Sequence, residues 1–345
     1  MLPGQNLKSY LLRLRRASVA EIAYRLRQSL RIAQMRHAFA KKKIIDVPRI
    51  DALEVEQLQL PDLSFNIDDS VLSKLIAGYC FTIGGGREAI EQFEKESRGK
   101  YFADIRSSSL SPDIRTVWEP ARLQHVTAML FCPAAKVARD AAQQMLLQWV
   151  RNNPFLSGPH YMSAMECGLR IPVFFYALKI LDDLTSNERL EILEMIYRHA
   201  WLVENRLSLY SSLGNHTICE CIGLIFAGSV FRSVSAGRNW LNKGLKLILV
   251  ELPRQILHDG GPAEQSLAYH RFVLDLYWLA FGFLKKNGIY ECGSFIPRLI
   301  LGEQFLEAFC DDQGHIPAIG DSDDGTAIAP GIKPRIYDET LPCHV

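Results

Sequence analysis

The sequence has no run of eighteen or more apolar residues, so it offers no segment long enough to cross a membrane as a helix. A secretory signal needs an unbroken apolar stretch near the N-terminus. The first residues, roughly thirty, lack one, because Arg13, Arg15 and Arg16 interrupt the leucines. Strand-like alternation of apolar and polar residues is nearly absent before the C-terminal part of the chain. These absences predict a cytoplasmic protein without a transmembrane segment, and an all-α fold.

The sequence also lacks the spacings of the common cofactor sites. Its eight cysteines are scattered, and Cys219 and Cys221 form the one close pair, without the gap or the second pair of a zinc site. Gly84-Gly85-Gly86 has neither a preceding strand nor a following Lys-Ser/Thr pair, so it is not a phosphate-binding loop. Asp321 to Gly325 fails the calcium-loop pattern, because Ile332 stands where the bidentate Glu belongs. The sequence therefore predicts no metal site and no required cofactor.

Charge is distributed unevenly along the chain. The net charge is +1, yet residues 1–43 carry eleven Lys and Arg against one acid, Glu21. Such a basic amphipathic start is typical of contact with an anionic membrane surface or an acidic polymer, and equally of a solvated helix face on an acidic body. Nucleic acid is not predicted as a partner, because basic and aromatic residues do not alternate.

Helical periodicity dominates. Ser18 and Glu21 form a capping box that predicts a helix to about Lys43, and residues 44–67, with Pro48 and Pro61, are predicted to be a loop or linker. The later helices are expected over residues 115–131, 134–151, 161–181, 186–210, 215–233, 237–257, 263–287 and 295–310. Short connectors make neighbouring helices antiparallel, which favours an α/α toroid or an irregular solenoid. The predicted regions are 1–67 (basic helices and linker), 68–312 (toroid) and 313–345 (start of a β region).

Two helix starts gather the side chains that can do chemistry. One is Gly214-Asn215-His216, and the other is Glu264-Gln265-Ser266 followed by Tyr269-His270-Arg271. Helix starts present unpaired backbone N–H groups and the positive end of the helix dipole, which suit them to anions. Removing a proton next to a carboxylate requires a donor that neutralises the carboxylate, an acid and a base.

Asn215 can grip a carboxylate with His216 beside it, and Tyr269 can act as the acid or, as tyrosinate, as the base. His216 or His270 can assist. Each group also has a structural explanation: Asn215 as a helix cap, Tyr269 and His270 as a hydrogen-bonded pair at an interface, and Glu264 as a partner of the helix dipole. The residues alone leave both interpretations open.

Several segments together resemble the heparinase II/III-like polysaccharide lyases. The resemblance runs from about Arg13 to Gly325. It is carried by Asp113 to Arg122, Trp149 to Pro154, Glu166 to Arg170, Gly214 to His216, Glu264 to Ser266 with Tyr269 to Arg271, and Gly320 to Gly325. For Trp118, Glu119, Arg122, Glu166 and Arg170, packing and buried ion pairing are favoured over catalysis.

The resemblance implies an α/α toroid followed by a β-sandwich, and β-elimination on a uronate-containing acidic polysaccharide. It implies Asn215 as the carboxylate neutraliser, Tyr269 as the general acid and His216 as a further catalytic contact. His160-Tyr161 stands where such lyases often carry Asn-Trp, so Tyr161 is expected to replace a sugar-stacking tryptophan. The predicted substrate-binding residues are Glu264, Gln265, Ser266, His270, Arg271, Tyr161 and His160.

The chain ends at Val345, where the resemblance places the start of the β-sandwich. The expected fold is therefore an incomplete toroid of antiparallel helix hairpins with only the start of that sandwich. Zinc ligands and a further base, which some family members carry in the sandwich, cannot be assigned. The alternative function is a truncated, non-catalytic carbohydrate-binding or accessory protein of surface-polysaccharide metabolism, and the alternative location is the periplasm.

Overall fold

The computed structural model describes residues 17–43, 45–65, 67–78, 87–106, 112–132, 136–210, 213–312, 315–321, 326–329 and 332–334. The chain divides into two compact units, Met1–Asp46 and Val47–Val345. Residues 47–67, which the sequence groups with the N-terminal linker, fall in the second unit. The region boundaries at 67 and 312 stay predictions.

The first unit contains the helix α2, Val19–Ala40. The Ser18 side chain accepts a hydrogen bond from the backbone N–H of Glu21 at 3.1 Å, so the predicted helix start is confirmed. The helix ends at Ala40, with Lys41 as its C-cap, three residues before the predicted end.

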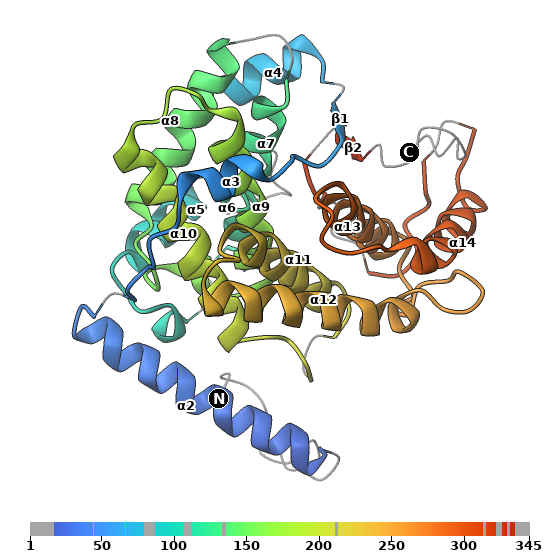
Figure 1. Ribbon diagram of the computed structural model, residues 1–345, viewed down its shortest axis with the longest axis horizontal. Coiled ribbons are helices and arrows are strands. Elements are labelled where there is room, and N and C mark those ends of the chain that lie inside the picture. The colour runs from blue at the N-terminus through green and yellow to red at the C-terminus, as the bar shows by residue number, and fades with distance from the viewer. Residues whose placement is uncertain are drawn as a thin grey trace. The chain divides into compact units, whose positions relative to one another are not determined.

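The second unit is built almost entirely of helices (Figure 1). Thr185 and Glu188 form a capping box at the start of α10, with the Thr185 hydroxyl bonding the Glu188 backbone and the Glu188 carboxylate bonding the Thr185 backbone. The α-helices are α3 (Ala52–Gln57), α4 (Asp69–Ile76), α5 (Arg87–Ser97), α6 (Ile114–Ala121), α7 (Gln124–Leu130), α8 (Lys136–Asn152), α9 (Ala164–Ile180), α10 (Ser186–Asn205), α11 (Asn215–Val230), α12 (Ser235–Gln255), α13 (Leu267–Lys286) and α14 (Ile296–Glu307). Short 3₁₀ turns are η1 (Phe102–Asp104), η2 (Pro159–Tyr161) and η3 (Gly293–Phe295). The predicted helices from 134 onward are thus present, with shifted ends.

The core lies around α9 and α11, which are buried along nearly their whole length. Helix α9 packs against α10 and α11, and α11 packs against α12 and α13. Glycines allow α9 and α11 to touch: a Cβ on Gly168 would lie 2.6 Å from the Cys219 carbonyl oxygen. This close contact fixes the start of α11, where Asn215 lies, against the rest of the bundle. The all-α prediction of an incomplete toroid of helix hairpins is confirmed.

Two predictions of local structure are wrong. The single helix expected over 115–131 is broken between α6 and α7, where Leu123 adopts a left-handed conformation with φ of 62°. The expected loop 44–67 contains the helix α3 and a strand, β1 (Leu63–Phe65), which pairs antiparallel with β2 (Ile332–Pro334). Within the described residues, the C-terminal strand therefore joins the beginning of the second unit rather than another C-terminal strand.

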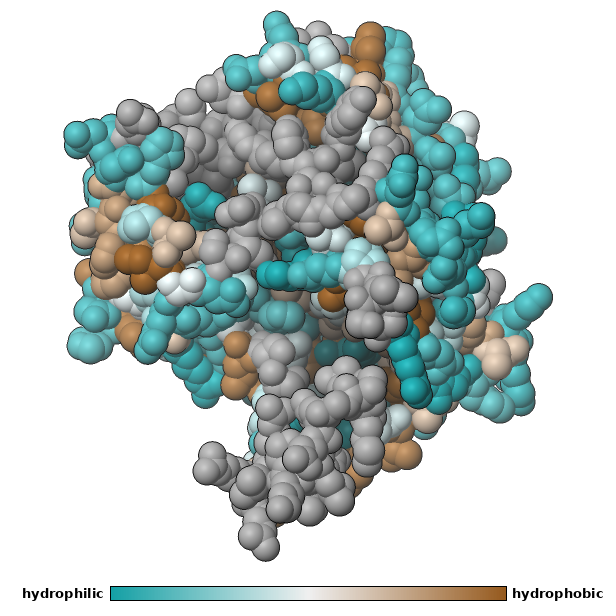
Figure 2. Space-filling model, turned by 180° about the vertical axis from the view of Figure 1, so that it is seen from behind, coloured by the Kyte–Doolittle hydropathy of each residue, from teal (hydrophilic) through white to brown (hydrophobic). Residues whose placement is uncertain are grey.

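The surface seen in Figure 2 is mainly hydrophilic around its edge, with smaller apolar groups between. No helix among the described residues is long and apolar enough to span a bilayer. The turn predicted at Gly84-Gly85-Gly86 lies outside the described residues.

Candidate functional site

The start of α11 is held by a carboxylate from another part of the chain. Glu264 accepts the backbone N–H of Asn215 through Oε1 at 2.7 Å and the side-chain amide of Asn215 through Oε2 at 3.1 Å. Asn215 is buried, and Gly214 before it has φ of 117°. A Cβ on Gly214 would lie 2.2 Å from Glu264 Oε1, so only glycine leaves room for this contact. Glu264 thus positions Asn215, and its predicted contact with substrate stays a prediction.

Tyr269 lies in the first turn of α13, where Ser266 caps the helix. The Ser266 hydroxyl accepts the backbone N–H of Tyr269 at 3.2 Å and itself donates to the Asp321 carbonyl. The Tyr269 hydroxyl donates to Asp321 Oδ2 at 3.3 Å. Asp321 therefore fixes both the cap and the phenol of the predicted general acid.

The segment before Asp321 runs along the turn that carries Glu264. Leu267 donates its backbone N–H to the Ile319 carbonyl at 3.2 Å. A Cβ on Gly320, which has φ of 82°, would lie 2.2 Å from the Gln265 carbonyl oxygen. Asp321 receives no role of its own from the sequence, where it is named only within a failed calcium loop and within the segment Gly320 to Gly325. Its position within the family-like motif, the segment 320–325, was the available signal.

A buried ion pair lies close to His216. Arg122 donates from Nε and Nη2 to the two carboxylate oxygens of Glu166, each at 2.8 Å, and both side chains are buried. Burial alone would raise the pKa of Glu166, but Arg122, with smaller contributions from Arg170 and His216, lowers it below its usual value. The predicted buried ion pairing of Arg122 and Glu166 is confirmed.

Three predicted substrate-binding residues are packed inside the protein. Tyr161 is fully buried, and its hydroxyl donates to the Asn153 carbonyl at 2.7 Å, which leaves no ring face for a sugar. His270 is buried with Nε2 3.1 Å from the Gly302 carbonyl, and burial lowers its pKa. Ser266 is used by the cap and Asp321. Core packing and helix capping thus occupy these three side chains, and their direct contact with substrate stays a prediction.

His160 lies at a cavity of about 410 Å³. Glu94 Oε1 is 3.3 Å from His160 Nε2, while His160 Nδ1 and Trp149 Nε1 are buried without a hydrogen-bond partner. Buried polar atoms in native proteins are normally satisfied, and these two nitrogens belong to residues that line the cavity. The cavity is also lined by Arg98, Gln148, Asn152 and Asn153.

Ser208, which precedes the start of α11, is held in place by Glu220. Ser208 donates its backbone N–H and its hydroxyl to the two oxygens of Glu220, each at 2.7 Å, and the Thr217 hydroxyl donates to the Ser208 carbonyl at 3.0 Å. Burial raises the pKa of Glu220 to about 8, although Ser208 and Arg206 oppose the shift. Glu220 is thus a buried acid that fixes the approach to the α11 start.

Among the predicted site residues, the structure joins Asn215 to Glu264 directly. Tyr269 follows on the same turn, with Gln265 exposed and with His216 and Arg271 half-buried. His160 and Tyr161 belong to η2 instead. Among the described residues, no three His, Cys, Asp or Glu side chains are grouped to hold a metal ion. Cys219 and Cys221 are buried and reduced, as packing residues would be.

Comparison with known proteins identifies the helical part of the chain. Residues 134–298 match the family model described as Heparinase II/III N-terminus. Over these residues the chain is similar to the N-terminal part of heparinase II/III proteins. A heparin-sulfate lyase of Bacteroides thetaiotaomicron is 26% identical over 163 residues, covering 43% of this chain and 23% of that protein. A heparin-sulfate lyase of Pedobacter heparinus is 30% identical over 77 residues, covering 22% of this chain and 12% of that protein.

The fold comparison agrees. The crystal structure of heparinase III has a TM-score of 0.52 with 15% sequence identity, covering 81% of this chain and 43% of that one. The chain thus spans less than half of the solved structure and less than a quarter of the curated relatives. The matched segment 134–298 includes Asn215, Glu264 and Tyr269.

Proposed function

We propose that this chain carries the toroid part of a polysaccharide lyase that cleaves uronate-containing acidic polysaccharide by β-elimination. The observation that carries the proposal is the contact between Asn215 and Glu264, which fixes an amide donor at a helix start. The segment that supplies Glu264 continues directly into Tyr269. An amide donor and a phenol are thereby brought into one structural unit.

Each group has a defined task in the proposed reaction. An amide nitrogen carries two hydrogens, so the bond from Asn215 to Glu264 leaves the second for the substrate carboxylate. The hydrogen bond from Asn215 to the substrate carboxylate, together with the positive end of the α11 dipole, stabilises the negative charge that grows as the neighbouring C–H proton leaves. Tyr269 donates its proton to the departing glycosidic oxygen as the C–O bond breaks and the C=C bond forms.

The proton on carbon requires a base. Of the two histidines considered for it, His270 is buried against the Gly302 carbonyl, so His216, next to Asn215 and half-buried, remains. We assign His216 as the group that assists removal of the proton on carbon. The buried pair of Arg122 and Glu166 supports its position.

A second candidate function is non-catalytic carbohydrate binding. The cavity at His160 and Trp149 favours it, because two unpartnered nitrogens and several amides suit a hydroxyl-bearing ligand. In that case the protein acts as an accessory of surface-polysaccharide metabolism.

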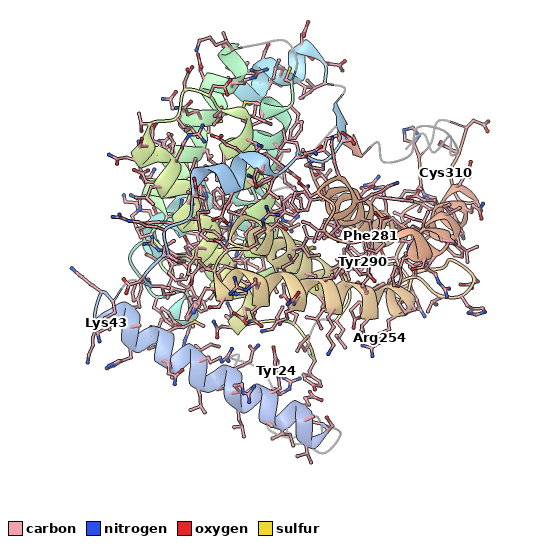
Figure 3. The ribbon with its side chains drawn as sticks, in the orientation of Figure 1. Tyr24, Lys43, Arg254, Phe281, Tyr290 and Cys310 are labelled. Carbon is pink, nitrogen blue, oxygen red and sulfur yellow. The ribbon has the colours of Figure 1, made fainter. Side chains whose placement is uncertain are left out.

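The deciding experiment follows ultraviolet absorbance with heparin, heparan sulfate, hyaluronan, alginate and a bacterial exopolysaccharide. Elimination leaves a C=C bond conjugated to the carboxylate, so absorbance rises with turnover. We expect Tyr269→Phe and Asn215→Ala to abolish the rise with unchanged helical circular dichroism, while Tyr290→Phe, labelled in Figure 3, retains it. A flat trace with retained binding to the panel supports the accessory function instead, and unfolding of both variants supports purely structural roles.

A further inference from the structure

The helix α2 carries an apolar stripe that faces solvent. Val19, Leu26 and Leu30 are 84%, 62% and 66% exposed, and they are among the most exposed large apolar side chains of the described chain. At about 100° per residue these three positions fall within an arc of about 40°, with Ala23 and Ala33 at its edges. Leucine and valine exposed in one continuous row mark an interaction surface rather than scattered surface residues.

Arginines flank the stripe on both sides. Arg27 and Arg31 follow one edge of the helix, and Arg25 and Arg36 follow the other, at about 80° to 120° from the centre of the stripe. Lys41, Lys42 and Lys43 continue the positive charge past the C-terminal end, where Figure 3 labels Lys43. The only acid of the described helix, Glu21, is paired with Arg25 at 2.7 Å. The helix therefore presents apolar side chains between two cationic rows.

The opposite face of α2 is different. It carries Tyr24, Gln28, Ile32, Met35 and Phe39, of which Met35 is buried and Gln28 donates to the Tyr24 hydroxyl at 2.6 Å. The helix is thus apolar on two sides, and its packing uses the side away from the stripe. Internal packing does not account for Val19, Leu26 and Leu30.

We propose that the stripe of α2 binds a membrane surface rich in anionic phospholipid. A helix that lies in the bilayer interface buries its apolar side chains among the acyl chains, while flanking arginines reach back to the phosphates. Each Lys or Arg near an anionic surface adds attraction that salt screens. Charge complementarity selects anionic lipid over the other occupants of an apolar stripe. The proposal does not depend on the lyase chemistry.

The test measures co-sedimentation of the full chain with phosphatidylcholine vesicles, with and without phosphatidylglycerol. We expect binding to the anionic vesicles that weakens as salt rises, and little binding to the neutral ones. Leu26→Glu with Leu30→Glu should weaken binding at least about tenfold, since apolar burial is replaced by repulsion. Arg27→Gln with Arg31→Gln should reduce the preference for anionic vesicles.

A matched control separates the stripe from general charge. Val137→Glu with Leu190→Glu changes two residues, 63% and 50% exposed, by the same charge on α8 and α10, and should bind as the unchanged protein does. Because Leu26 and Leu30 are exposed, their variants should keep the thermal unfolding of the parent, and Leu26→Ala with Leu30→Ala offers a milder pair. Absence of binding to anionic vesicles overturns the proposal. So does binding that heparin competes for and that needs the arginines but not the leucines, or loss of a dimer in light scattering without a change in vesicle binding.

Discussion

Glu264 holds Asn215 by two bonds, one to the backbone N–H at 2.7 Å and one to the side-chain amide at 3.1 Å. An asparagine side chain can otherwise rotate about two bonds, so the carboxylate selects one orientation of the amide. The amide is therefore already ordered in the folded protein, and substrate binding does not have to order it. Glu264 is a positioning residue in the proposed reaction.

Removing this carboxylate should slow turnover more than it weakens substrate binding. We expect Glu264→Ala to lower kcat about 10²-fold, since small misplacements of a catalytic group cost that much, with a smaller change in KM. Glu264→Gln keeps one acceptor and should fall between. The measurement is steady-state kinetics by absorbance, with the exposed Glu291→Ala as control. A Glu264→Ala variant with the parent kcat would show that Asn215 does not depend on the clamp.

Asp321 should act through Tyr269. Its side chain accepts the Tyr269 hydroxyl, whereas its backbone carbonyl accepts Ser266, so side-chain variants leave the cap in place. We expect Asp321→Ala to lower kcat about tenfold and Asp321→Asn, whose amide oxygen still accepts, to restore most of it. In the Tyr269→Phe background, Asp321→Ala should add no further loss. An additive loss in that double variant contradicts the assignment.

Gly214→Ala should be much more harmful than alanine at an open glycine. The new Cβ would lie 2.2 Å from Glu264 Oε1 at φ of 117°, whereas Gly288, with φ of 60°, has no atom within 4 Å of its added Cβ. We expect about 1–2 kcal/mol of lost stability for Gly288→Ala, from backbone strain alone, and more for Gly214→Ala. Urea unfolding measures both. Equal losses would show that strain, not the clash with Glu264, dominates at position 214.

Breaking the ion pair of Arg122 and Glu166 should lower the free energy of unfolding strongly, whereas replacing both residues by apolar ones should lower it little. Arg122→Met alone leaves a buried carboxylate without its partner, and should lower the free energy of unfolding by about 3–5 kcal/mol. Arg122→Met together with Glu166→Leu removes both charges and should recover most of that loss. The comparison uses denaturant unfolding of the three proteins. A double variant as unstable as the single one would show that shape, not charge, governs this site.

Glu220 should make stability depend on pH. Its pKa is raised to about 8 in the folded protein, from 4.5, so the folded state binds the proton more tightly. Stability is therefore full below about pH 4.5 and falls between pH 4.5 and 8, by at most about 1.4 kcal/mol per pH unit. Glu220→Gln mimics the protonated acid and should remove this part of the slope. Thermal unfolding across this pH window tests it, and an unchanged slope in Glu220→Gln contradicts it.

The helical fold was predictable because its signals are local. Periodic apolar residues and the caps at Ser18 and Thr185 each depend on a few neighbouring positions. The break between α6 and α7 has a sequence signal in Pro120, but the left-handed residue itself was not predictable, because it is Leu123 and not a glycine. Strand β1 is three residues long and exists through pairing with β2, so it carries no pattern of its own.

The residues of the candidate site were predictable from the sequence, but the contacts by which one residue positions another were not. Asn215, His216 and Tyr269 follow from the two helix starts. The sequence does not reveal that Glu264 faces Asn215 across 49 positions, or that Asp321 faces Tyr269 across 52. Tyr161 and His270 have side chains that suit a sugar, and only packing decides that they are buried.

The contacts around Asp321 also determine when parts of the candidate site can form during synthesis of the chain. Helices α8 to α12 can pack as soon as they leave the ribosome, because their partners are neighbours in the chain. The cap at Ser266 and the Tyr269 phenol find their acceptor only when residue 321 emerges, and β1 waits still longer for residues 332–334. In a nascent chain that stalls before residue 321, neither contact with Asp321 can form.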